Sequence, residues 1–334
     1  MSEVSPRDVP VEPGLDQERH RFLAEVAALY YEANLTQSEI AAELEISRSS
    51  VSRLLSEARE LGVVDIKIRW PSDSSGDLSA QIKQAFGLPE AHIVHSGGRG
   101  YTQTIEALGS VAAELLERKL RDNMVLGISW NTGVYQVVRA FRAAAHHTGV
   151  KVVQLTGSVG VINPLLDGPD LARWLAQMLG GQYLYLPAPL VVESPQIRQA
   201  LLADRTIAER LDLAHRADIA LVGIGTVFPP LCSLIQTDYL SEEELAEITA
   251  MGGVGDILTT FYDIDGNILP LPLHERTIGL PLEALRDLPC VIGVAAGDVK
   301  APAIVGALRG NYLTCLVTDD KAARAMLKLA DTRA

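Results

Sequence analysis

From about Leu78 to the end of the chain, short runs rich in valine, isoleucine and leucine alternate with stretches of helical periodicity. The apolar runs include MVLGIS, VKVVQLTG, IALVGIG, CVIGVAAG and LTCLVTD, and helical patterns such as 104–121, 133–145 and 302–309 lie between them. Near-continuous apolar strands that are joined by helices indicate a mostly parallel sheet. This part of the chain is therefore predicted to form a Rossmann-like α/β domain.

A different pattern precedes this domain. Apolar residues recur at helical spacing from about residue 17 to residue 33, and two short amphipathic helices follow. Thr36 and Glu39 have the spacing of a capping box, Ser47 is placed to cap the next helix, and Gly62 marks its end. The order of helix, helix, tight turn and helix predicts a helix-turn-helix. The alternating VVDIKIRW that follows predicts a strand, which would form a wing.

The second short helix has the residues of a recognition helix. Such a helix presents polar and basic side chains in its first turns, where they reach base edges. Arginine pairs with guanine, serine bonds phosphates or bases, and the start of the preceding helix can contact the DNA backbone. The candidate DNA-binding residues are Gln37, Ser47, Arg48, Ser49, Ser50, Ser52 and Arg53. An ordinary pair of packed helices would explain the apolar spacing, but not a capped Ser-Arg-Ser-Ser run after a tight turn.

The turn between the two short helices carries Glu45, where many such motifs have glycine. A left-handed conformation costs a residue other than glycine roughly 1 kcal/mol. Asn34 is placed to end the first helix.

The charge of the chain sets a condition on DNA binding. The formal net charge is -13, and residues 36–69 hold five basic and six acidic side chains, which gives a local charge of -1. This acidity argues against nonspecific coating of DNA or of an anionic membrane. A module with few phosphate contacts binds DNA modestly and needs two or more copies acting together. The charge therefore predicts an oligomer.

The 334 residues suffice for two domains. We expect a flexible leader over 1–17, a DNA-binding domain over 18–70, a linker over 71–77 and an effector-binding and oligomerisation domain over 78–334. No apolar run reaches the roughly 18–20 residues that span a bilayer. The N-terminal segment lacks the basic start and apolar core of a secretion signal. A soluble, cytoplasmic protein without a membrane partner is expected.

The three cysteines, Cys232, Cys290 and Cys315, are widely spaced and form no C-x-x-C pair. This spacing predicts buried apolar side chains rather than a disulfide framework or a zinc site. No metal and no cofactor are expected.

Polar turns follow several of the predicted strands. In open parallel sheets, ligands bind beyond the carboxyl ends of the strands. The turn SWNTG, residues 129–133, begins a helix whose amides and hydroxyls would cradle an anion. A second turn, TGSVG, covers residues 156–160, and Lys300 places an ammonium before another helix. Asp256 and Gln154 can accept hydrogen bonds from sugar hydroxyls.

The candidate effector-binding residues are therefore Ser129, Asn131, Thr132, Gly133, Gln154, Gly157, Ser158, Asp256 and Lys300. Each has another interpretation. The turns can simply connect strands, Asp256 can cap a helix, and Lys300 can be a solvated surface charge. Because the two turns, Asp256 and Lys300 all fall at the ends of predicted strands, we favour the interpretation that they form a ligand-binding site.

The segment LYYEANLTQSEIAAELEISRSSVSRLLSEARELGVVDIKI resembles the N-terminal domain of the SorC family of bacterial transcriptional regulators. GISWNTGV, VVQLTGSVG, LPAPLVVES and GGVGDILTTFYDIDG are similar to motifs of the family's effector domain, in the same order. The resemblance implies a domain that is similar in fold to sugar-phosphate isomerases and deaminases and that binds phosphorylated sugars. It also implies phosphate contacts at residues 129–133 and Lys300, sugar contacts at Asp256, and tetramers assembled from dimers.

One departure from the family is Asn131, where glycine is usual; its side chain either narrows the phosphate loop or adds a donor. We expect a regulator of carbohydrate or polyol metabolism genes whose partners are operator DNA and a phosphorylated sugar or polyol. The alternative is a sugar-phosphate isomerase or deaminase that carries a DNA-binding module, since fold does not define function. No histidine–carboxylate pair falls in a site turn, and His274 beside Glu275 has no assigned role. The prediction is that the protein is not an enzyme.

Overall fold

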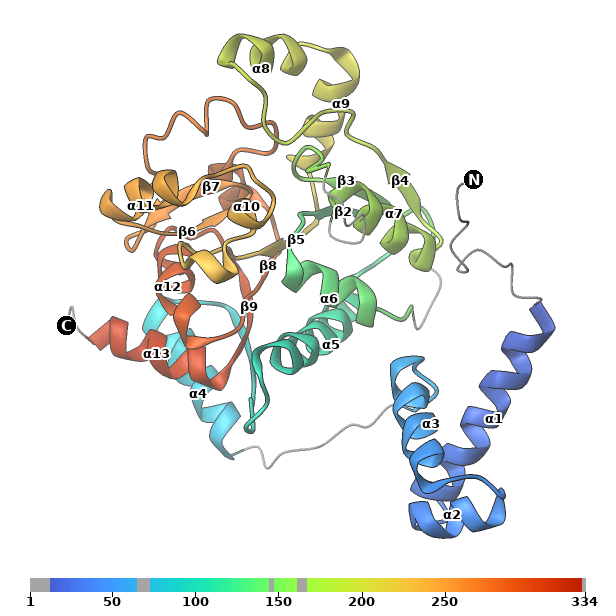
Figure 1. Ribbon diagram of the computed structural model, residues 1–334. Coiled ribbons are helices and arrows are strands. Elements are labelled where there is room, and N and C mark those ends of the chain that lie inside the picture. The colour runs from blue at the N-terminus through green and yellow to red at the C-terminus, as the bar shows by residue number, and fades with distance from the viewer. Residues whose placement is uncertain (1–12, 65–72, 144–146, 161–166, 332–334) are drawn as a thin grey trace, which may run out of the picture. The chain divides into compact units, whose positions relative to one another are not determined.

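The computed structural model describes residues 13–64, 73–143, 147–160 and 167–331 (Figure 1). The chain divides into two compact units, Met1–Trp70 and Pro71–Ala334. Most of the predicted leader and the predicted wing strand after Val64 lie outside the described residues.

The first unit contains the three helices that the sequence predicts. They are α1 (Pro13–Tyr31), α2 (Gln37–Glu43) and α3 (Arg48–Glu60). Helix α1 begins four residues before the predicted start, so the expected leader is wrong for residues 13–17. The helices enclose one core of buried side chains: Leu23, Val26, Ala27, Ile40, Ala41, Val51, Leu54, Leu55 and Ala58.

Both predicted N-terminal caps are confirmed. The Thr36 hydroxyl accepts from the Glu39 backbone N–H at 3.3 Å, and the Glu39 carboxylate accepts from the Thr36 N–H at 2.7 Å. The Ser47 hydroxyl accepts from the Ser50 N–H at 3.1 Å and so starts α3. These bonds satisfy amides that have no partner within their helices.

The turn between α2 and α3 contains a left-handed residue at Glu45, the position where many such motifs have glycine. Glu45 has a φ of 53°, and the N–H of Ile46 donates to the carbonyl of Ala41 at 3.0 Å. This is the bond of a Schellman motif, which ends a helix with one left-handed residue, usually glycine. Ile46 packs against the core of the unit. The turn therefore sets the angle between the two helices. The left-handed backbone of Glu45 makes this turn less stable than it would be with glycine at that position.

Glu45→Gly is expected to stabilise the first unit by about 0.5–1 kcal/mol, because glycine adopts a positive φ without strain. Glu43→Gly removes the same charge from a right-handed position in α2 and should destabilise the unit by about 1 kcal/mol. Urea unfolding followed by circular dichroism measures both variants. Equal effects of the two substitutions on the free energy of unfolding would show that the left-handed conformation of Glu45 does not account for the stability change.

The second unit is built on a seven-stranded parallel sheet. Its strands are β1 (Glu90–Val94), β2 (Val125–Ile128), β3 (Lys151–Gln154), β4 (Gln182–Leu184), β5 (Ile219–Gly223), β8 (Val291–Val294) and β9 (Cys315–Asp319). Their spatial order is β4-β3-β2-β5-β8-β9-β1, and every pair is parallel. Apart from β1 at the edge, this is the doubly wound order of Rossmann folds. The direction of strand addition reverses between β2 and β5.

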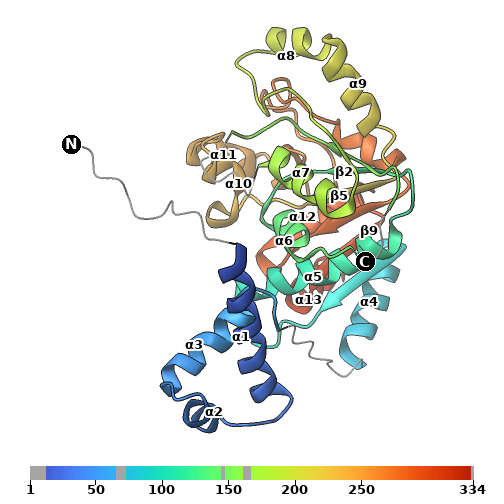
Figure 2. The ribbon, with the colours of Figure 1, turned by 90° about the vertical axis from the view of Figure 1, so that its right-hand side faces the viewer.

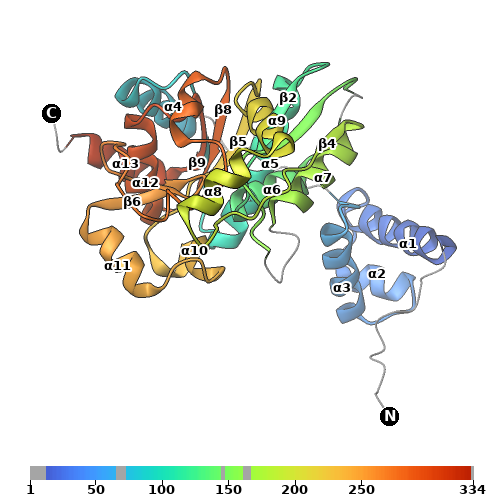
Figure 3. The same cartoon turned by 90° about the horizontal axis from the view of Figure 1, so that it is seen from above.

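Helices cover both faces of the sheet (Figure 3). On one face, α5 (Tyr101–Lys119), α6 (Thr132–Ala140) and α7 (Gly168–Leu179) contribute to a single core cluster. On the other face lie α4 (Asp73–Phe86), α9 (Arg205–Ala214), α12 (Ala301–Arg309) and α13 (Asp320–Asp331). The predicted α/β fold is confirmed.

Helix α4 overlaps the predicted linker over 71–77, because it begins at Asp73. Leu78 and Ile82, four residues apart on one face of the helix, are buried and account for its packing. The Asp and Ser residues that suggested a linker are equally typical of the first turn of a helix. The expectation of a linker is therefore wrong for residues 73–77.

A smaller group of elements lies beside the sheet (Figure 2). It comprises the antiparallel hairpin of β6 (Gly253–Ile257) and β7 (Thr260–Asp263), with α10 (Ser233–Gln236) and α11 (Glu242–Ala250). Residues of α10, α11 and β7 share a separate core cluster. The sequence analysis does not anticipate this antiparallel hairpin. The other elements are α8 (Pro195–Leu202) and the 3₁₀ helices η2 (Pro229–Leu231), η3 (Leu282–Asp287) and η4 (Asp298–Lys300).

Among the described residues, no helix combines the length and apolar character that crossing a bilayer requires.

Candidate DNA-binding surface and effector site

The first turns of α3 present the predicted recognition residues in two groups. Arg48, Ser49, Ser52 and Arg53 are exposed. Ser47 is exposed as well, and its hydroxyl bonds the hydroxyls of Ser49 and of the half-buried Ser50, at 2.8 Å each, as part of the helix cap. The exposed group therefore forms the outward surface, while the cap holds the start of the helix.

Gln37 and Arg48 line the same open concavity, of about 560 Å³, where the starts of α2 and α3 meet. Its other lining residues are Tyr30, Tyr31, Asn34, Leu35, Thr36 and Ser38. The two tyrosines and Ser38 are not among the DNA-binding residues predicted from the sequence. Their positions at the end of α1 and the start of α2 become significant only in the folded unit.

Two acidic side chains of this unit are engaged by contacts within it. Glu57 forms an ion pair with Arg19, with 2.6 Å between Oε2 and Nη2, and this bond lowers the pKa of Glu57. Glu39 is engaged in the capping box of α2. Two of the six acids counted over 36–69 are thus held by contacts inside the unit, while Arg48 and Arg53 stay exposed.

In the second unit, the loop of residues 129–133 lies where the strand order reverses. It follows β2 and starts α6, and β5 is the neighbouring strand. The Ser129 hydroxyl accepts from the Gly223 N–H at 3.3 Å, and the Ser129 N–H donates to the Leu221 carbonyl at 3.0 Å. This is the place where doubly wound sheets bind ligands.

Asn131 forms the N-cap of α6. Its Oδ1 accepts from the Val134 N–H at 2.8 Å. A Cβ atom on Gly223 would lie 1.5 Å from Nδ2 of Asn131, so no larger residue fits there without displacing the cap. The Asn131 side chain thus fills the space above the end of β5.

Lys300 and Asp256 approach this loop from other elements. Lys300 ends η4, which follows β8; it is 7% exposed, and its Nζ donates to the carbonyl of Ile224 at 2.7 Å. Burial lowers the pKa of Lys300 to about 8, against the opposing charge of Asp256. Burial raises the pKa of Asp256 to about 6, against the charge of Lys300. Lys300 is therefore buried rather than a solvated surface charge, and Asp256 lies in strand β6 rather than at a helix cap.

Two small cavities adjoin at this point. The first has about 30 Å³ and is lined by residues that include Asn131, Thr132, Gly133 and Lys300. The second has about 20 Å³ and is lined by residues that include Ser129, Asn131, Asp256 and Thr156. Asn131 and Ser233 line both. The structure therefore brings together six of the nine predicted effector residues: Ser129, Asn131, Thr132, Gly133, Asp256 and Lys300.

The second predicted turn is arranged differently. The backbone N–H groups of Gly157 and Ser158 donate to the carbonyls of Ile278 and Ala188, at 2.9 Å each. Those of Val159 and Gly160 donate to the carboxylate of Asp167 at 2.9 and 3.1 Å. These amides are engaged by the protein, so the turn is not an anion cradle in this structure. Its contribution to the cavities is Thr156.

Gln154 holds strands together. Its side-chain carbonyl accepts from the Tyr183 hydroxyl at 2.8 Å and from the Leu186 N–H at 3.1 Å, and the residue is 1% exposed. Gln154 lines neither of the two cavities. The expectation that it contacts a sugar is not supported, because its oxygen already bonds two donors in and beyond β4.

The cavities also have walls that the sequence analysis missed. Tyr101, Ser233 and Gln236 line the first cavity, and Leu258 and Thr259 line the second. Leu258 and Thr259 form the turn of the β6–β7 hairpin with φ values of 53° and 65°. Positive φ at both central residues is typical of a type I′ turn, which usually has Asn-Gly. The sequence LT therefore contains no signal for this turn.

His274 has a structural position. Its Nε2 accepts from the Phe261 N–H at 3.0 Å, and burial lowers its pKa to about 4. A neutral imidazole that accepts a backbone hydrogen bond is consistent with the absence of an assigned role.

A helix-turn-helix unit, combined with a polar site at the reversal point of a parallel sheet, defines a class of protein: DNA-binding regulators that respond to a ligand. Residues 72–328 match the family of sugar-binding domains, and residues 23–60 match region 4 of sigma-70 factors. The chain is 34% identical to the deoxyribonucleoside regulator of Bacillus subtilis over 313 residues, which cover 94% of this chain and 99% of the relative. It is 32% identical to the sorbitol operon regulator of Klebsiella pneumoniae, over 92% of this chain and 98% of the relative.

The crystal structure of full-length SorC from Klebsiella pneumoniae superimposes with a TM-score of 0.73, at 32% identity, and covers 92% of this chain and 98% of that one. The chain belongs to the SorC family of sugar-binding transcriptional regulators. These relatives are transcriptional regulators and not enzymes. The chain is thus a transcriptional regulator with a helix-turn-helix for DNA and an effector domain of the sugar-binding type.

Gly223→Ala is expected to destabilise the second unit by about 2–4 kcal/mol, because the new methyl group displaces the Asn131 cap and overpacks the strand end. Asn131→Gly alone should cost only a few tenths of a kcal/mol, since glycine is an acceptable N-cap. Adding Asn131→Gly to Gly223→Ala should recover at least 1 kcal/mol, measured by thermal unfolding. Additive effects of the two substitutions would mean that this contact is not the one that excludes a side chain at Gly223.

Proposed function

We propose that this protein controls genes of carbohydrate or polyol metabolism by binding operator DNA through α3 and a phosphorylated sugar or polyol at the reversal point of its sheet. The observation that carries the proposal is the buried Lys300 ammonium, which lines one cavity with Thr132 and Gly133 at the start of α6. The names of the deoxyribonucleoside and sorbitol operon regulators support this class of effector.

On the DNA side, Arg48 and Arg53 would contact base edges or phosphates, with Ser49 and Ser52 beside them. These four side chains are exposed on the first turns of α3. Ser47 and Ser50 would act mainly through the cap that positions the helix. Gln37 would contact the backbone, because it lines one concavity with Arg48 at the start of α2.

Arg53→Ala is expected to weaken operator binding at least tenfold, the order of effect for an arginine that reads a base or a phosphate. Arg59→Ala is the matched control: Arg59 lies in the last turn of α3 and bonds the Leu55 carbonyl and the Ser56 hydroxyl of its own helix. Fluorescence anisotropy with operator DNA at fixed salt measures both. If the control weakens binding equally, the loss reflects helix integrity or charge rather than recognition.

On the effector side, the N–H groups at the start of α6 and the Lys300 ammonium would bind the phosphate. A helix N-terminus and a lysine point charge both favour an anion. Asp256 would accept hydrogen bonds from sugar hydroxyls at the second cavity, and Asn131, which lines both cavities, would lie between the two parts of the ligand.

Binding requires the site to open. The two cavities, of about 30 and 20 Å³, hold only a few water molecules, whereas sites for small organic ligands measure about 300 Å³ or more. Ser233 and Gln236 on α10 form one wall and the hairpin turn of Leu258 and Thr259 forms another. A ligand that binds only the open form shifts the protein toward it. We propose that this shift changes how DNA-binding modules are paired in a tetramer, arranged as a dimer of dimers.

Affinity for phosphorylated ligands is expected to fall as the pH rises through about 8. Below that pH the Lys300 ammonium is charged, and above it deprotonation, favoured by burial, removes the charge. The second ionisation of a phosphate ester, near pH 6, is already complete, so affinity should weaken by up to tenfold per pH unit above 8. Calorimetric titration of sugar and polyol phosphates between pH 7 and 9.5 would measure this.

Lys300→Met should abolish the pH dependence and weaken phosphorylated ligands at least tenfold more than their unphosphorylated parents. Lys321→Met, which removes an exposed ammonium from α13, should leave both unchanged. Equal losses for phosphorylated and unphosphorylated ligands in Lys300→Met would exclude Lys300 from the phosphate site.

A further inference from the structure

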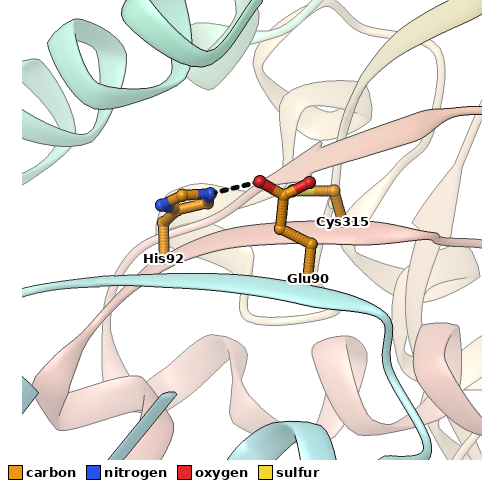
Figure 4. A group of neighbouring side chains, drawn as sticks. All are labelled: Glu90, His92 and Cys315. Carbon is orange, nitrogen blue, oxygen red and sulfur yellow. Dashed lines mark hydrogen bonds and ion pairs between the residues drawn. The ribbon is translucent and has the colours of Figure 1, made fainter. Parts of the chain in front are cut away.

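Three side chains with metal-binding atoms converge at the edge of the sheet (Figure 4). Glu90 is the first residue of β1 and Cys315 is the first residue of β9, and the two are register partners in this parallel pair. His92 follows Glu90 by two residues, so both project from the same face of β1. The figure shows the imidazole and the carboxylate pointing toward each other above the strand, with Cys315 behind the carboxylate.

The spacing of their atoms is close to that of a metal site. One potential ligand atom from each residue lies within 4.8 Å of the other two, and His92 Nε2 is 2.8 Å from Glu90 Oε1. In a tetrahedral zinc site with bonds of about 2.0–2.3 Å, ligand atoms are separated by about 3.3–3.8 Å. Small side-chain rotations therefore suffice to bring the three atoms to that separation.

The type of ligand atoms selects the kind of metal. A thiolate, an imidazole and a carboxylate together suit zinc and similar transition metals rather than magnesium or calcium, which prefer oxygen. The Glu90 and His92 side chains are 33% and 28% exposed, so water can reach a fourth position. We propose that Glu90, His92 and Cys315 form a binding site for a zinc-like divalent metal ion at the edge of the sheet.

Lys119 forms an ion pair with Glu90 beside the proposed metal site. Its Nζ lies 2.6 Å from Glu90 Oε2 and leaves Oε1, the oxygen that faces His92, for a metal. A partner on the outer oxygen orients a ligating carboxylate, as in many metal sites. Zinc with one thiolate and one carboxylate is electrically neutral, so the nearby ammonium faces no net positive charge. Without metal, the same lysine balances the charge of Glu90.

The position of the site indicates its role. It lies at the amino ends of β1 and β9, whereas the effector cavities lie beyond the carboxyl ends of the central strands. A metal there would join the edge strand β1 to β9, independently of effector binding. From the sequence no metal is expected, because the three cysteines are widely spaced and form no C-x-x-C pair.

The test uses the full-length protein, stripped of metal with a chelator and titrated with zinc chloride by calorimetry. The expected result is one zinc ion per chain, with affinity reduced at least tenfold in His92→Gln and in Cys315→Ala. Cys232→Ala is the matched control, because Cys232 is an equally buried thiol in a different core cluster. It should bind zinc like the unaltered chain.

Cobalt chloride provides a spectroscopic readout of the sulfur ligand. A thiolate-to-cobalt absorption band should appear in the unaltered chain and in Cys232→Ala, and should be absent from Cys315→Ala. Failure of the unaltered chain to bind one equivalent would overturn the proposal, as would undiminished affinity in His92→Gln. His92 is partly exposed, so this variant keeps the test decisive even if Cys315→Ala does not fold.

Discussion

The contact between Asn131 and Gly223 joins the two halves of the sheet at the point where strand order reverses. One residue caps α6 and the other ends β5, and the hydroxyl of Ser129 bonds the same strand end. Because both halves meet here, the loops that follow the strands converge, and the polar groups of the effector site are gathered in one place. Asn131 lines both adjoining cavities and Gly223 lines the second, so this contact forms part of the wall of the site.

Burial gives this region its electrostatic character. The Lys300 ammonium is buried and donates to the Ile224 carbonyl. It interacts with the Asp256 carboxylate, so the pKa of Lys300 and the pKa of Asp256 each depend on the charge of the other group. A ligand that supplies an anion to one and hydroxyls to the other would replace water and relieve the desolvation of both. The acidic overall charge is compatible with DNA binding, because the exposed arginines of α3 are grouped and the nearby Glu57 carboxylate is paired with Arg19.

The described cavities are too small for a sugar phosphate. Such a ligand would therefore bind only after the site opens. One wall of the cavities is α10, which packs in a separate core cluster. Another wall is the hairpin turn of Leu258 and Thr259, whose left-handed backbone is conformationally costly for residues other than glycine. In the proposed function, a fold whose ligand site is closed has at least two states. The effector would select between them, which is what ligand-dependent control of transcription requires.

Local sequence determined the elements whose signals are local. The capping box at Thr36, the cap at Ser47 and the parallel α/β pattern each depend on neighbours within a few residues or on apolar periodicity. The loop of residues 129–133 and Lys300 were identified because polar turns at strand ends have a general meaning in parallel sheets. The start of α4 was assigned to a linker, because the packing that favours a helix there comes from residues distant in the chain.

Tertiary structure alone decided what distant segments do together. In the folded protein the amides of the TGSVG turn donate to Asp167 and to two backbone carbonyls. Gln154 accepts from Tyr183, and Ser233 and Thr259 line the cavities. Tertiary structure also placed Cys315 beside Glu90 and His92, more than 200 positions away. Periodicity and caps are encoded by near neighbours, whereas hydrogen-bond partners and cavity walls depend on which strands become adjacent, and a single sequence contains no direct signal for that adjacency.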